Sequence, residues 1–312
     1  MFEIVRYTPD RAVEWNRFVA QSKNGTFLFD RRYMDYHQDR FSDHSLMFYD
    51  EKGLLAVLPA NVVDDRLFSH QGLTYGGLVM GERAVAVQVC ELFRELNGYL
   101  WQYGVRRVVY KPVPWIYHRL PSEEDLYALV QVCHASLTVR ELSTTIVLPR
   151  NLRWSRIRRR GVKRAQEAGV EVEVSTDFAA FWPVLADNLL TNHQVRPVHS
   201  LEEILLLHHR FPESIVLYTA RLHGEVMGGV VLYLTPQVVH AQYSSATPEG
   251  KRLGVLDAIY DRIMHEDMSD WPFFDFGKST EDEGRYLNEQ LIFQKEGFGG
   301  RAVCYDTYEW EL

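Results

Sequence analysis

Apolar residues along the first half of the chain recur with the two periods that distinguish strands from helices. Alternation with period two predicts strands, and apolar residues three or four positions apart predict helices. The predicted elements are a strand at 2–7, helices at 13–19 and 31–38, strands at 45–49, at 54–63 and up to Gly76–Gly77, a helix at 85–103, a strand at 105–110, a helix at 123–133 and a strand at 139–148. The order is strand, two helices, three strands, helix, strand, helix, strand.

The second half of the chain repeats this order. Asp177 is placed to cap one helix, and Ser200 with Glu203 forms a capping box at the start of the next. The predicted elements are a strand at 170–174, helices beginning after 177 and 200, strands at 215–222, 226–234 and 238–244, a helix at 253–268, a strand at 273–276, a helix at 286–297 and a strand at 302–310. We therefore predict a structural repeat of two domains, 1–149 and 150–312.

The stretch 271–300 combines a short apolar strand with a polar loop. Phe273, Phe274 and Phe276 surround Asp275, which is the pattern of a strand covered on both faces. Ligands of open α/β sheets bind at the carboxyl ends of strands, so the polar residues at this end are candidates for substrate binding. They are Asp275, Lys278 and Ser279. A solvated loop is the alternative interpretation.

Composition limits the classes of protein that this chain can represent. Its 312 residues suit two domains, and 46% hydrophobic with 24% charged residues is ordinary for a globular protein. A net charge of -8 argues against a DNA-binding protein. Three widely spaced cysteines without a C-x-x-C motif predict neither a disulfide framework nor a metal site. With no signal peptide and no long apolar run, we expect a cytoplasmic protein without a membrane span.

The junction at 150–164 is the most basic part of this acidic chain. Its basic residues are Arg150, Arg153, Arg156, Arg158, Arg159, Arg160, Lys163 and Arg164. Such a cluster indicates a surface for phosphates, whether of a nucleotide, of coenzyme A or of a tRNA backbone. The alternative is a connecting helix whose charges are simply solvated.

The order of elements resembles the GNAT acyltransferase fold, and two such halves in one chain resemble the Fem family and its FemAB-like acetyltransferase relatives. The segments that carry the resemblance are "RIRRRGVKRAQEAGVEVEV" (156–174), "DFGKS" (275–279) and "FQKEGFGG" (293–300). The resemblance implies an α/β fold of two tandem GNAT-like domains. Each would be a mixed, mostly antiparallel sheet flanked by helices, and the second would be catalytic.

The activity that the resemblance implies is acyl transfer to an amine of a sugar or another cell-envelope precursor. Acetyltransferase relatives would use acetyl-CoA or another acyl-CoA, whereas Fem ligases use aminoacyl-tRNA to extend cell-wall precursor peptides. The acceptor would be a small molecule, and a nucleotide-linked one is compatible with the family. A duplicated binding protein without catalytic activity is a third hypothesis. In GNAT folds the fourth and fifth strands separate and the acyl thioester lies between them; here these strands are 238–244 and 273–276.

The pyrophosphate motif of GNAT enzymes, Q/R-x-x-G-x-G/A, corresponds to "EGKRLGVLDA" in this chain. Lys251, Gly254 and Leu256 stand where arginine, glycine and glycine are expected, so the match is partial. Gly250 and Gly254 permit close approach of the backbone, and Lys251 and Arg252 supply positive charge near a helix amino terminus. These four residues are the candidates for binding the phosphates of CoA.

Three residues are candidates for catalysis. Lys295 lies in the segment that resembles the Fem lysine near the reacting carbonyl, where its charge would stabilise the transition state, although Gln294 separates it from Phe293. His240 and Tyr243 lie on the predicted fourth strand and are candidates for a general base or acid. Since they are three positions apart, a period of two places them on opposite faces, so we expect at most one to reach the substrate.

Two further segments are candidates for substrate binding. The loop between the first two helices of the second half, which in GNAT folds shapes the acceptor pocket, contains His193, Arg196 and His199. An arginine there suits a carboxylate or a phosphate. In the first half, which Fem ligases use to hold the nucleotide part of the acceptor, the corresponding strand ends contain Tyr75, Lys111 and Tyr117.

Overall fold

The computed structural model describes residues 2–150 and 152–312, except for the side chains of residues 192 and 193. The chain forms two compact units. Unit 1 extends to Leu142 and also includes Thr280–Tyr286 and Cys304–Leu312, and unit 2 comprises Ser143–Ser279 and Leu287–Val303. The division between the units lies a few residues before the boundary predicted at 149/150. The sequence pattern did not indicate that two C-terminal segments join unit 1.

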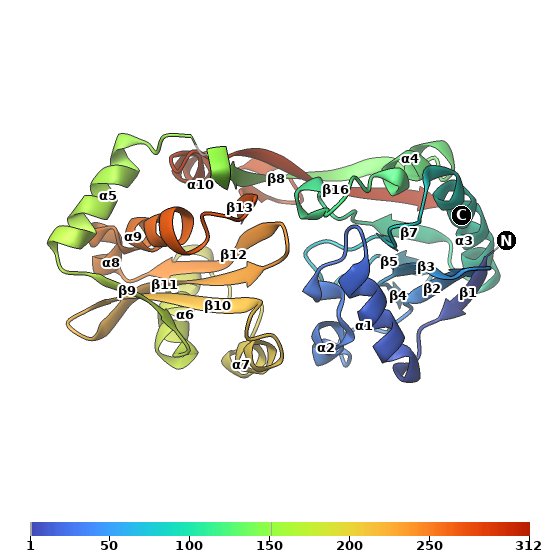
Figure 1. The fold of residues 1–312 in the computed structure, drawn as a ribbon, viewed down its shortest axis with the longest axis horizontal. Helices are drawn as coiled ribbons and strands as arrows, with labels where there is room; N and C mark the ends of the chain where they lie inside the picture. The colour runs from blue at the N-terminus through green and yellow to red at the C-terminus, as the bar shows by residue number, and fades with distance from the viewer. Residues whose placement is uncertain (1, 151) are drawn as a thin grey trace. The chain divides into compact units, whose positions relative to one another are not determined.

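Unit 1 begins with a strand, two helices and a series of short strands (Figure 1). Its elements are β1 (Glu3–Arg6), α1 (Ala12–Gln21), α2 (Arg31–Met34), the 3₁₀ turn η3 (Asp35–His37), β2 (Leu46–Asp50), β3 (Gly53–Leu58), β4 (Asn61–Val63), β5 (Arg66–Phe68), β6 (Val79–Met80), α3 (Ala86–Gln102), β7 (Arg107–Tyr110) and α4 (Glu124–Gln131). Two long strands, β8 (Ser136–Val147) and β16 (Arg301–Glu311), each contribute residues to both units. A small ribbon pairs β14 (Thr280–Glu281) with β15 (Tyr286–Leu287).

The strands of unit 1 belong to two sheets. One has the order β1-β2-β3-β6, and the other has the order β4-β5-β7-β16-β8, in which β5 and β7 are parallel. The strand predicted at 54–63 is divided, because β3 ends at Leu58 and β4 pairs in the second sheet. The strand predicted to reach Gly76–Gly77 is wrong for most of its length: β5 ends at Phe68, and a loop follows whose backbone bonds to the end of β7.

Unit 2 contains one continuous series of strands with helices on both faces. Its elements are α5 (Arg156–Glu167), β9 (Glu171–Ser175), α6 (Phe178–His193), α7 (Leu201–Arg210), β10 (Ile215–Leu222), β11 (Glu225–Leu234), β12 (Val238–Ala246), α8 (Pro248–Leu253), α9 (Val255–Arg262), a π-helical turn (Ile263–Asp267), β13 (Phe273–Lys278) and α10 (Glu289–Glu296). The strand order is β8-β13-β12-β11-β10-β9, in which β12 and β13 are parallel and the other neighbouring strands are antiparallel.

The two faces of the unit 2 sheet carry different helices. Figure 1 shows α6 and α7 on one face of β9–β12 and α5, α8 and α9 on the other. The face toward α9 holds a buried apolar cluster that includes Val230, Leu232, Phe274, Phe276 and Ile259. Burial of apolar side chains is the main stabilising contribution to such a layer, at about 25 cal/mol per Å². The opposite face of the two parallel strands carries polar side chains, and these form the site described below.

Helix caps agree with the sequence at Asp177 and at Ser200, and two helix boundaries differ from the prediction. The capping box of Ser200 and Glu203 is present, as predicted. The helix predicted at 253–268 corresponds to α9 and the π-helical turn after it, and Gly254, with a φ of 82°, separates it from the short helix α8, which was not predicted. The helix predicted at 286–297 begins only at Glu289, where Asn288 caps it by accepting from the Leu291 amide at 2.9 Å. The predicted α/β class with mixed, mostly antiparallel sheets flanked by helices is confirmed.

Candidate active site

The two parallel strands of unit 2 pair over three residues and then separate. Val238, Val239 and His240 of β12 face Phe273, Phe274 and Asp275 of β13, and no further pair joins the two strands among the residues that the structure describes. The register between β13 and β8 also shifts between Asp275 and Lys278, next to Gly277 with its φ of 74°. The chain therefore opens a gap beside β12 immediately after the His240–Asp275 pair.

Asp275 lies fully buried at this point and accepts three side-chain hydrogen bonds. The donors are the hydroxyls of Ser143 at 2.5 Å and Thr145 at 2.8 Å and the Nδ1–H of His240 at 2.9 Å. Burial raises the pKa of a carboxyl group, but the hydrogen bonds that His240, Ser143 and Thr145 donate outweigh it, so the pKa of Asp275 lies below its ordinary value. Asp275 was predicted to bind substrate; in the structure its side chain is fully buried and contacts His240, Ser143 and Thr145.

His240 is fixed in one tautomer by this contact. Because Nδ1 donates its proton to a carboxylate, Nε2 is the nitrogen that carries the lone pair and can take a proton from a reacting group. The imidazole lies beside the backbone of Gly277, where a Cβ would stand 3.4 Å from Cε1. Asp275, His240 and the end of β13 thus form one rigid group at the point of strand separation.

Lys295 reaches the same end of β13 from α10. Its ammonium group donates to the carbonyl oxygens of Gly277 at 2.8 Å and Lys278 at 2.7 Å. Burial lowers the pKa of Lys295 to about 8, although the negative charge of Asp275 opposes the shift. An ammonium group has three N–H bonds, so one remains for a substrate oxygen. Lys295 and His240, two of the residues predicted from the sequence, thus both lie beside Gly277.

Tyr243 lies on the same face of the sheet as His240, contrary to the prediction that the two residues face opposite ways. His240 is opposite Tyr233 and Tyr243 is opposite Val231, and these two partners are two positions apart on β11. The register shift between Val231 and Leu232 leaves one extra residue in β12, which is a β-bulge and reverses the alternation. Strand periodicity alone does not predict this.

The Tyr243 hydroxyl is held by His199, a residue predicted in the acceptor loop. The hydroxyl lies 2.6 Å from Nδ1 of His199 and accepts the backbone N–H of the same residue at 3.3 Å. Both side chains are buried, and burial raises the pKa of Tyr243 to about 12. Of the other predicted acceptor residues, Arg196 is exposed, and the side chain of His193 lies outside the part that the structure describes.

Lys278 and Ser279 differ in their surroundings although they are neighbours in β13 and the loop after it. The Lys278 side chain is exposed, and its carbonyl holds Lys295. The Ser279 side chain is buried, and its hydroxyl has no hydrogen-bond partner within residues 2–150 and 152–312. A buried hydroxyl without a partner is costly, so Ser279 is the stronger candidate to contact a bound substrate.

The residues predicted in unit 1 form part of its core. The rings of Tyr75 and Tyr117 are 4.5 Å apart and both are buried. The Tyr75 hydroxyl donates to Thr26 at 3.2 Å, and the Tyr117 hydroxyl lies 3.0 Å from that of Tyr305. The two tyrosines, predicted to bind substrate, are therefore packing residues, and Lys111 is a half-buried residue whose backbone N–H donates to the Ser69 hydroxyl.

The predicted phosphate-binding turn is packed against other parts of unit 2. A Cβ on Gly254 would stand 2.7 Å from the carbonyl oxygen of Gly161 in α5, and one on Gly250 would stand 2.3 Å from the carbonyl oxygen of Met227. Lys251 donates to the side chain of Asn188, and Arg252 is exposed. The two glycines thus allow protein segments to approach one another, which the sequence pattern cannot distinguish from approach to a phosphate.

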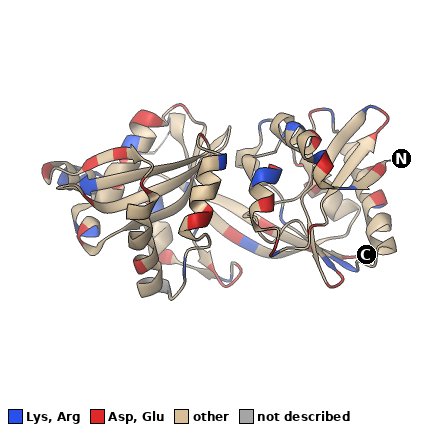
Figure 2. Cartoon of the chain, turned by 90° about the horizontal axis from the view of Figure 1, so that it is seen from below, with Lys and Arg blue, Asp and Glu red and all other residues tan. Residues whose placement is uncertain are grey.

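Helix α5 contains most of the basic junction. Arg158 forms an ion pair with Asp257 of α9 at 2.8 Å, and Lys163 pairs with Glu167 at 3.5 Å. The other basic side chains of the helix are exposed: Arg156, Arg159, Arg160 and Arg164. Figure 2 shows basic and acidic residues over both units, and α5 is the helix in which basic residues dominate.

Ser143 and Thr145 are residues of the site that sequence reasoning missed. They are two positions apart in β8, so they project from the same face, and both reach Asp275. The run of three hydroxyl residues Ser143, Thr144 and Thr145, of which the first and third share a face, was the available signal. Among the side chains that the structure describes, no group of three or more His, Cys, Asp or Glu could hold a metal ion, and no helix of the same residues is long and apolar enough to cross a membrane.

The part of the chain that contains the two separating parallel strands, β12 and the first residues of β13, is also the part that matches a known family. Residues 153–285 match the family described as "Acetyltransferase (GNAT) domain" and therefore form a domain of that family. No curated protein sequence matches the chain.

Solved structures share the fold over the whole chain. FemX has a TM-score of 0.71 at 11% sequence identity, covering 99% of this chain and 97% of FemX. The C-terminal domain of a putative lysylphosphatidylglycerol synthetase from Agrobacterium fabrum has a TM-score of 0.63 at 13% identity, covering 97% and 92%. A tandem GNAT protein from the clavulanic acid biosynthesis pathway has a TM-score of 0.51 at 12% identity, covering 100% and 98%. The predicted relationship to tandem GNAT and Fem-like proteins is confirmed at the level of the fold.

Proposed function

We propose that the protein is an N-acyltransferase that moves an acyl group from an acyl-CoA to the amine of a sugar or another cell-envelope precursor. The observation that carries the proposal is the convergence of Lys295 and the His240–Asp275 pair where β12 and β13 separate. Acyl transfer to an amine needs a group that removes a proton and a donor that stabilises the oxyanion. These residues supply both.

The reaction proceeds by direct attack of the amine on the thioester carbonyl. His240 Nε2 takes a proton from the attacking amine, which forms the C–N bond, and Asp275 stabilises the resulting imidazolium. The remaining N–H of Lys295 donates to the developing oxyanion. The C–S bond then breaks, and the thiolate of CoA leaves with the proton that His240 had taken.

Measurement of thiol release tests this proposal. Acetyl-CoA is incubated with the protein and a library of amino sugars and other amines, and we expect release that depends on the amine. Lys295→Ala should reduce turnover roughly 10²- to 10³-fold, as expected for loss of one oxyanion donor. Lys52→Ala, an exposed lysine of the β2–β3 hairpin, is the control and should leave turnover unchanged. Absence of release with every acyl-CoA and amine would reject the acyl-CoA reaction.

In a second candidate function, the same site acts but the acyl donor is aminoacyl-tRNA. The observation that favours it is α5, which packs on the first turn of α9 at Gly254 and presents Arg156, Arg159 and Arg160 to solvent. Fem ligases, which the sequence resembles, use such a donor. Exposed arginines on one helix suit an RNA backbone, and binding would weaken steeply with salt.

Comparison of the two donors distinguishes these functions. Under the second candidate, tRNA binds at moderate salt, acetyl-CoA gives no calorimetric signal, and Arg156→Glu with Arg160→Glu removes tRNA binding. Under the first, acetyl-CoA binds and the same double variant has little effect on thiol release. A protein that binds a ligand of either kind without transfer of an acyl group would support the third hypothesis, a binding protein without catalytic activity.

A further inference from the structure

Helix α10 carries Lys295 but contributes little packing of its own. None of its eight residues, all of which the structure describes, is buried, and Leu291 and Phe293 are exposed. Helices in proteins are stabilised mainly by the packing of an apolar face, so α10 alone does not fix the place of its lysine. The position of Lys295 must therefore depend on what holds the ends of the helix.

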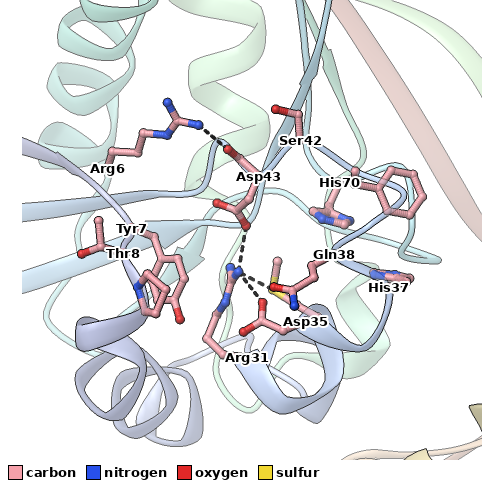
Figure 3. A pocket seen from close by; sticks show the side chains of 13 residues that line it. Arg6, Tyr7, Thr8, Arg31, Asp35, His37, Gln38, Ser42, Asp43 and His70 are labelled. Atoms are coloured by element: carbon pink, nitrogen blue, oxygen red, sulfur yellow. Dashed lines mark hydrogen bonds and ion pairs between the residues drawn. The ribbon is translucent and has the colours of Figure 1, made fainter.

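The amine of Lys295 is sensitive to the position of α10 because its partners are backbone atoms. It donates to the carbonyl oxygens of two successive residues at the end of β13, at 2.8 and 2.7 Å. The buried arginine of unit 1 is held differently, since Nη2 of Arg31 donates to the carboxylates of Asp35 at 2.5 Å and Asp43 at 2.8 Å, as Figure 3 shows. The attraction of an ion pair falls off slowly with distance, whereas a hydrogen bond to a carbonyl is lost over a short displacement. A small shift of α10 thus separates the lysine from its partners.

One aromatic ring fixes the carboxyl end of α10. Phe298 is only 4% exposed, and its backbone N–H donates to the carbonyl oxygen of Lys295 at 3.1 Å. The centre of its ring lies 5.2 Å from that of Phe276 in β13 and 5.2 Å from that of Tyr260 in α9, distances at which ring pairs are favourable. Phe276 immediately precedes Gly277, whose carbonyl oxygen accepts from Lys295. The ring and the lysine therefore reach the same end of β13 from adjoining positions of the chain.

The start of α5 and the chain before it hold the same ring from another side. The Trp154 ring meets that of Phe298 edge to face at 4.8 Å, and the guanidinium carbon of Arg158 lies 5.1 Å from the centre of the Phe298 ring. The backbone N–H of Ser155 donates to the carbonyl oxygen of Gly297 at 2.7 Å. Contacts from β13, α9 and α5 thus meet at one side chain, and that side chain follows directly on the helix that carries the lysine.

We propose that Phe298 is a positioning residue for Lys295: its ring fixes the carboxyl end of α10 against β13, so that the amine lies where β12 and β13 separate. For the function of the lysine this rests on the acyl transfer proposed above. For the position of the amine it does not, because that position can be measured without turnover. If Phe298 served packing alone, its substitution would lower stability and leave the surroundings of the amine as they are.

Competitive labelling with acetic anhydride, which reacts with neutral amines, tests the position of the amine in the full chain. Acetylation of each lysine is followed by mass spectrometry from about pH 6 to 11 in the native protein and in Phe298→Leu. Burial lowers the pKa of Lys295 to about 8, so its labelling should be half-maximal near that pH in the native protein. In Phe298→Leu the amine becomes solvated, and the midpoint should rise by about one unit or more toward the ordinary value for lysine. The negative charge of Asp275, which opposes the effect of burial, is present in both proteins.

Phe178→Leu is the matched control for this substitution. Phe178 is a fully buried phenylalanine of α6, on the other face of the unit 2 sheet, where its ring packs against His208 (Figure 1). The control loses the same atoms from a core, so its melting temperature should fall, but the labelling midpoint of Lys295 should stay at the native value. Lys52, an exposed lysine, should label alike in all three proteins.

Thiol release from acyl-CoA gives the second readout. Turnover should fall roughly 10- to 100-fold in Phe298→Leu, with the decline at alkaline pH moved to higher pH, because a displaced lysine is misplaced and solvated. A labelling midpoint of Lys295 that is unchanged in Phe298→Leu would overturn the proposal, whether or not turnover falls. A shifted midpoint in a protein whose native form releases no thiol would support the positioning and reject the acyl transfer. If Phe298→Leu does not fold, Phe298→Met, which conserves volume, takes its place and is read by the same midpoint.

Discussion

Nδ1 of His240 lies 2.9 Å from Oδ2 of Asp275, across the last backbone pair that joins β12 to β13. The hydrogen bond therefore fixes the imidazole at the position where the two strands begin to separate. A carboxylate that orients a histidine also sets which ring nitrogen carries the proton. In the proposed reaction, proton transfer by His240 thus depends on Asp275, a residue that is fully buried.

Asp275→Asn should reveal this dependence. The amide can still bond to the imidazole but no longer stabilises its protonated form, so we expect turnover to fall roughly 10²-fold or more with little change in KM. Nitrogen NMR of His240 should show a changed tautomer. Because the pKa of Asp275 is depressed in the folded state, the native carboxylate contributes stability above the unfolded pKa that is lost as pH falls through the folded value. The variant should therefore lose much of this acid-dependent change in the free energy of unfolding.

Lys295 should produce an alkaline limb in the pH–rate profile. Its pKa lies near 8, so the ammonium form that stabilises an oxyanion declines above that pH. Lys295→Arg keeps the charge at all accessible pH values, and we expect the variant to retain some activity and to lose the decline above about pH 8. If Lys295→Arg shows the same decline in rate, the decline comes from the titration of another group.

The same lysine should also make the stability of the fold depend on pH. Stability should rise with pH in the range where activity falls. The folded pKa is about 8 and the ordinary value is 10.5, so between these values the unfolded chain binds a proton that the folded protein does not. Stability from this group therefore rises with pH across that window. Urea unfolding of the native protein and of Lys295→Met between pH 7 and 10.5 measures how much of the pH dependence of stability comes from this lysine. If the lysine is solvated, the two proteins should show nearly the same pH dependence.

Ser143→Ala and Thr145→Val test the two residues that hold Asp275 from β8. Each removes one hydroxyl donor, so the pKa of Asp275 should rise and the acid limb of the rate profile should move to higher pH. We expect each variant to lose about 1 to 3 kcal/mol of stability, because a buried carboxylate loses a partner. Loss of stability with an unmoved pH profile would show that the hydroxyls serve packing alone. Thr280→Val, outside this group, is a suitable control.

Gly254→Ala separates two effects at the turn between α8 and α9. Its φ of 82° disfavours a side chain, and a Cβ would also meet the backbone of Gly161. Gly224 has a φ of 84° with no atom near its Cβ position, so Gly224→Ala isolates the backbone effect at about 1 to 2 kcal/mol. We expect Gly254→Ala to lose clearly more than this in urea unfolding. Equal losses of unfolding free energy in the two variants would show that α5 moves away from the added Cβ at little cost.

Sequence patterns predicted most of the elements and, among the residues of the site, His240, Asp275 and Lys295. The capping box of Ser200 and the strand containing Asp275 follow from local residue types, and Lys295 was found through a short motif. The contribution of Ser143 and Thr145 could not be predicted, because it depends on the register between β8 and β13, which are far apart in the sequence. For the same reason, Tyr75 and Tyr117 were assigned to substrate binding although tertiary packing buries them.

The extra residue in β12 has a consequence for comparing this chain with its relatives. Deletion of Gln242 would restore regular alternation and leave Tyr243 on the same face as His240, whereas a regular strand that kept Gln242 would turn Tyr243 toward the core beside α9. A sequence alignment that slides by one position here therefore exchanges the inner and outer sides of the strand. Relatives should be compared by the residue that pairs with the position of Val231. A sequence motif with a fixed spacing between histidine and tyrosine would miss relatives that lack the bulge.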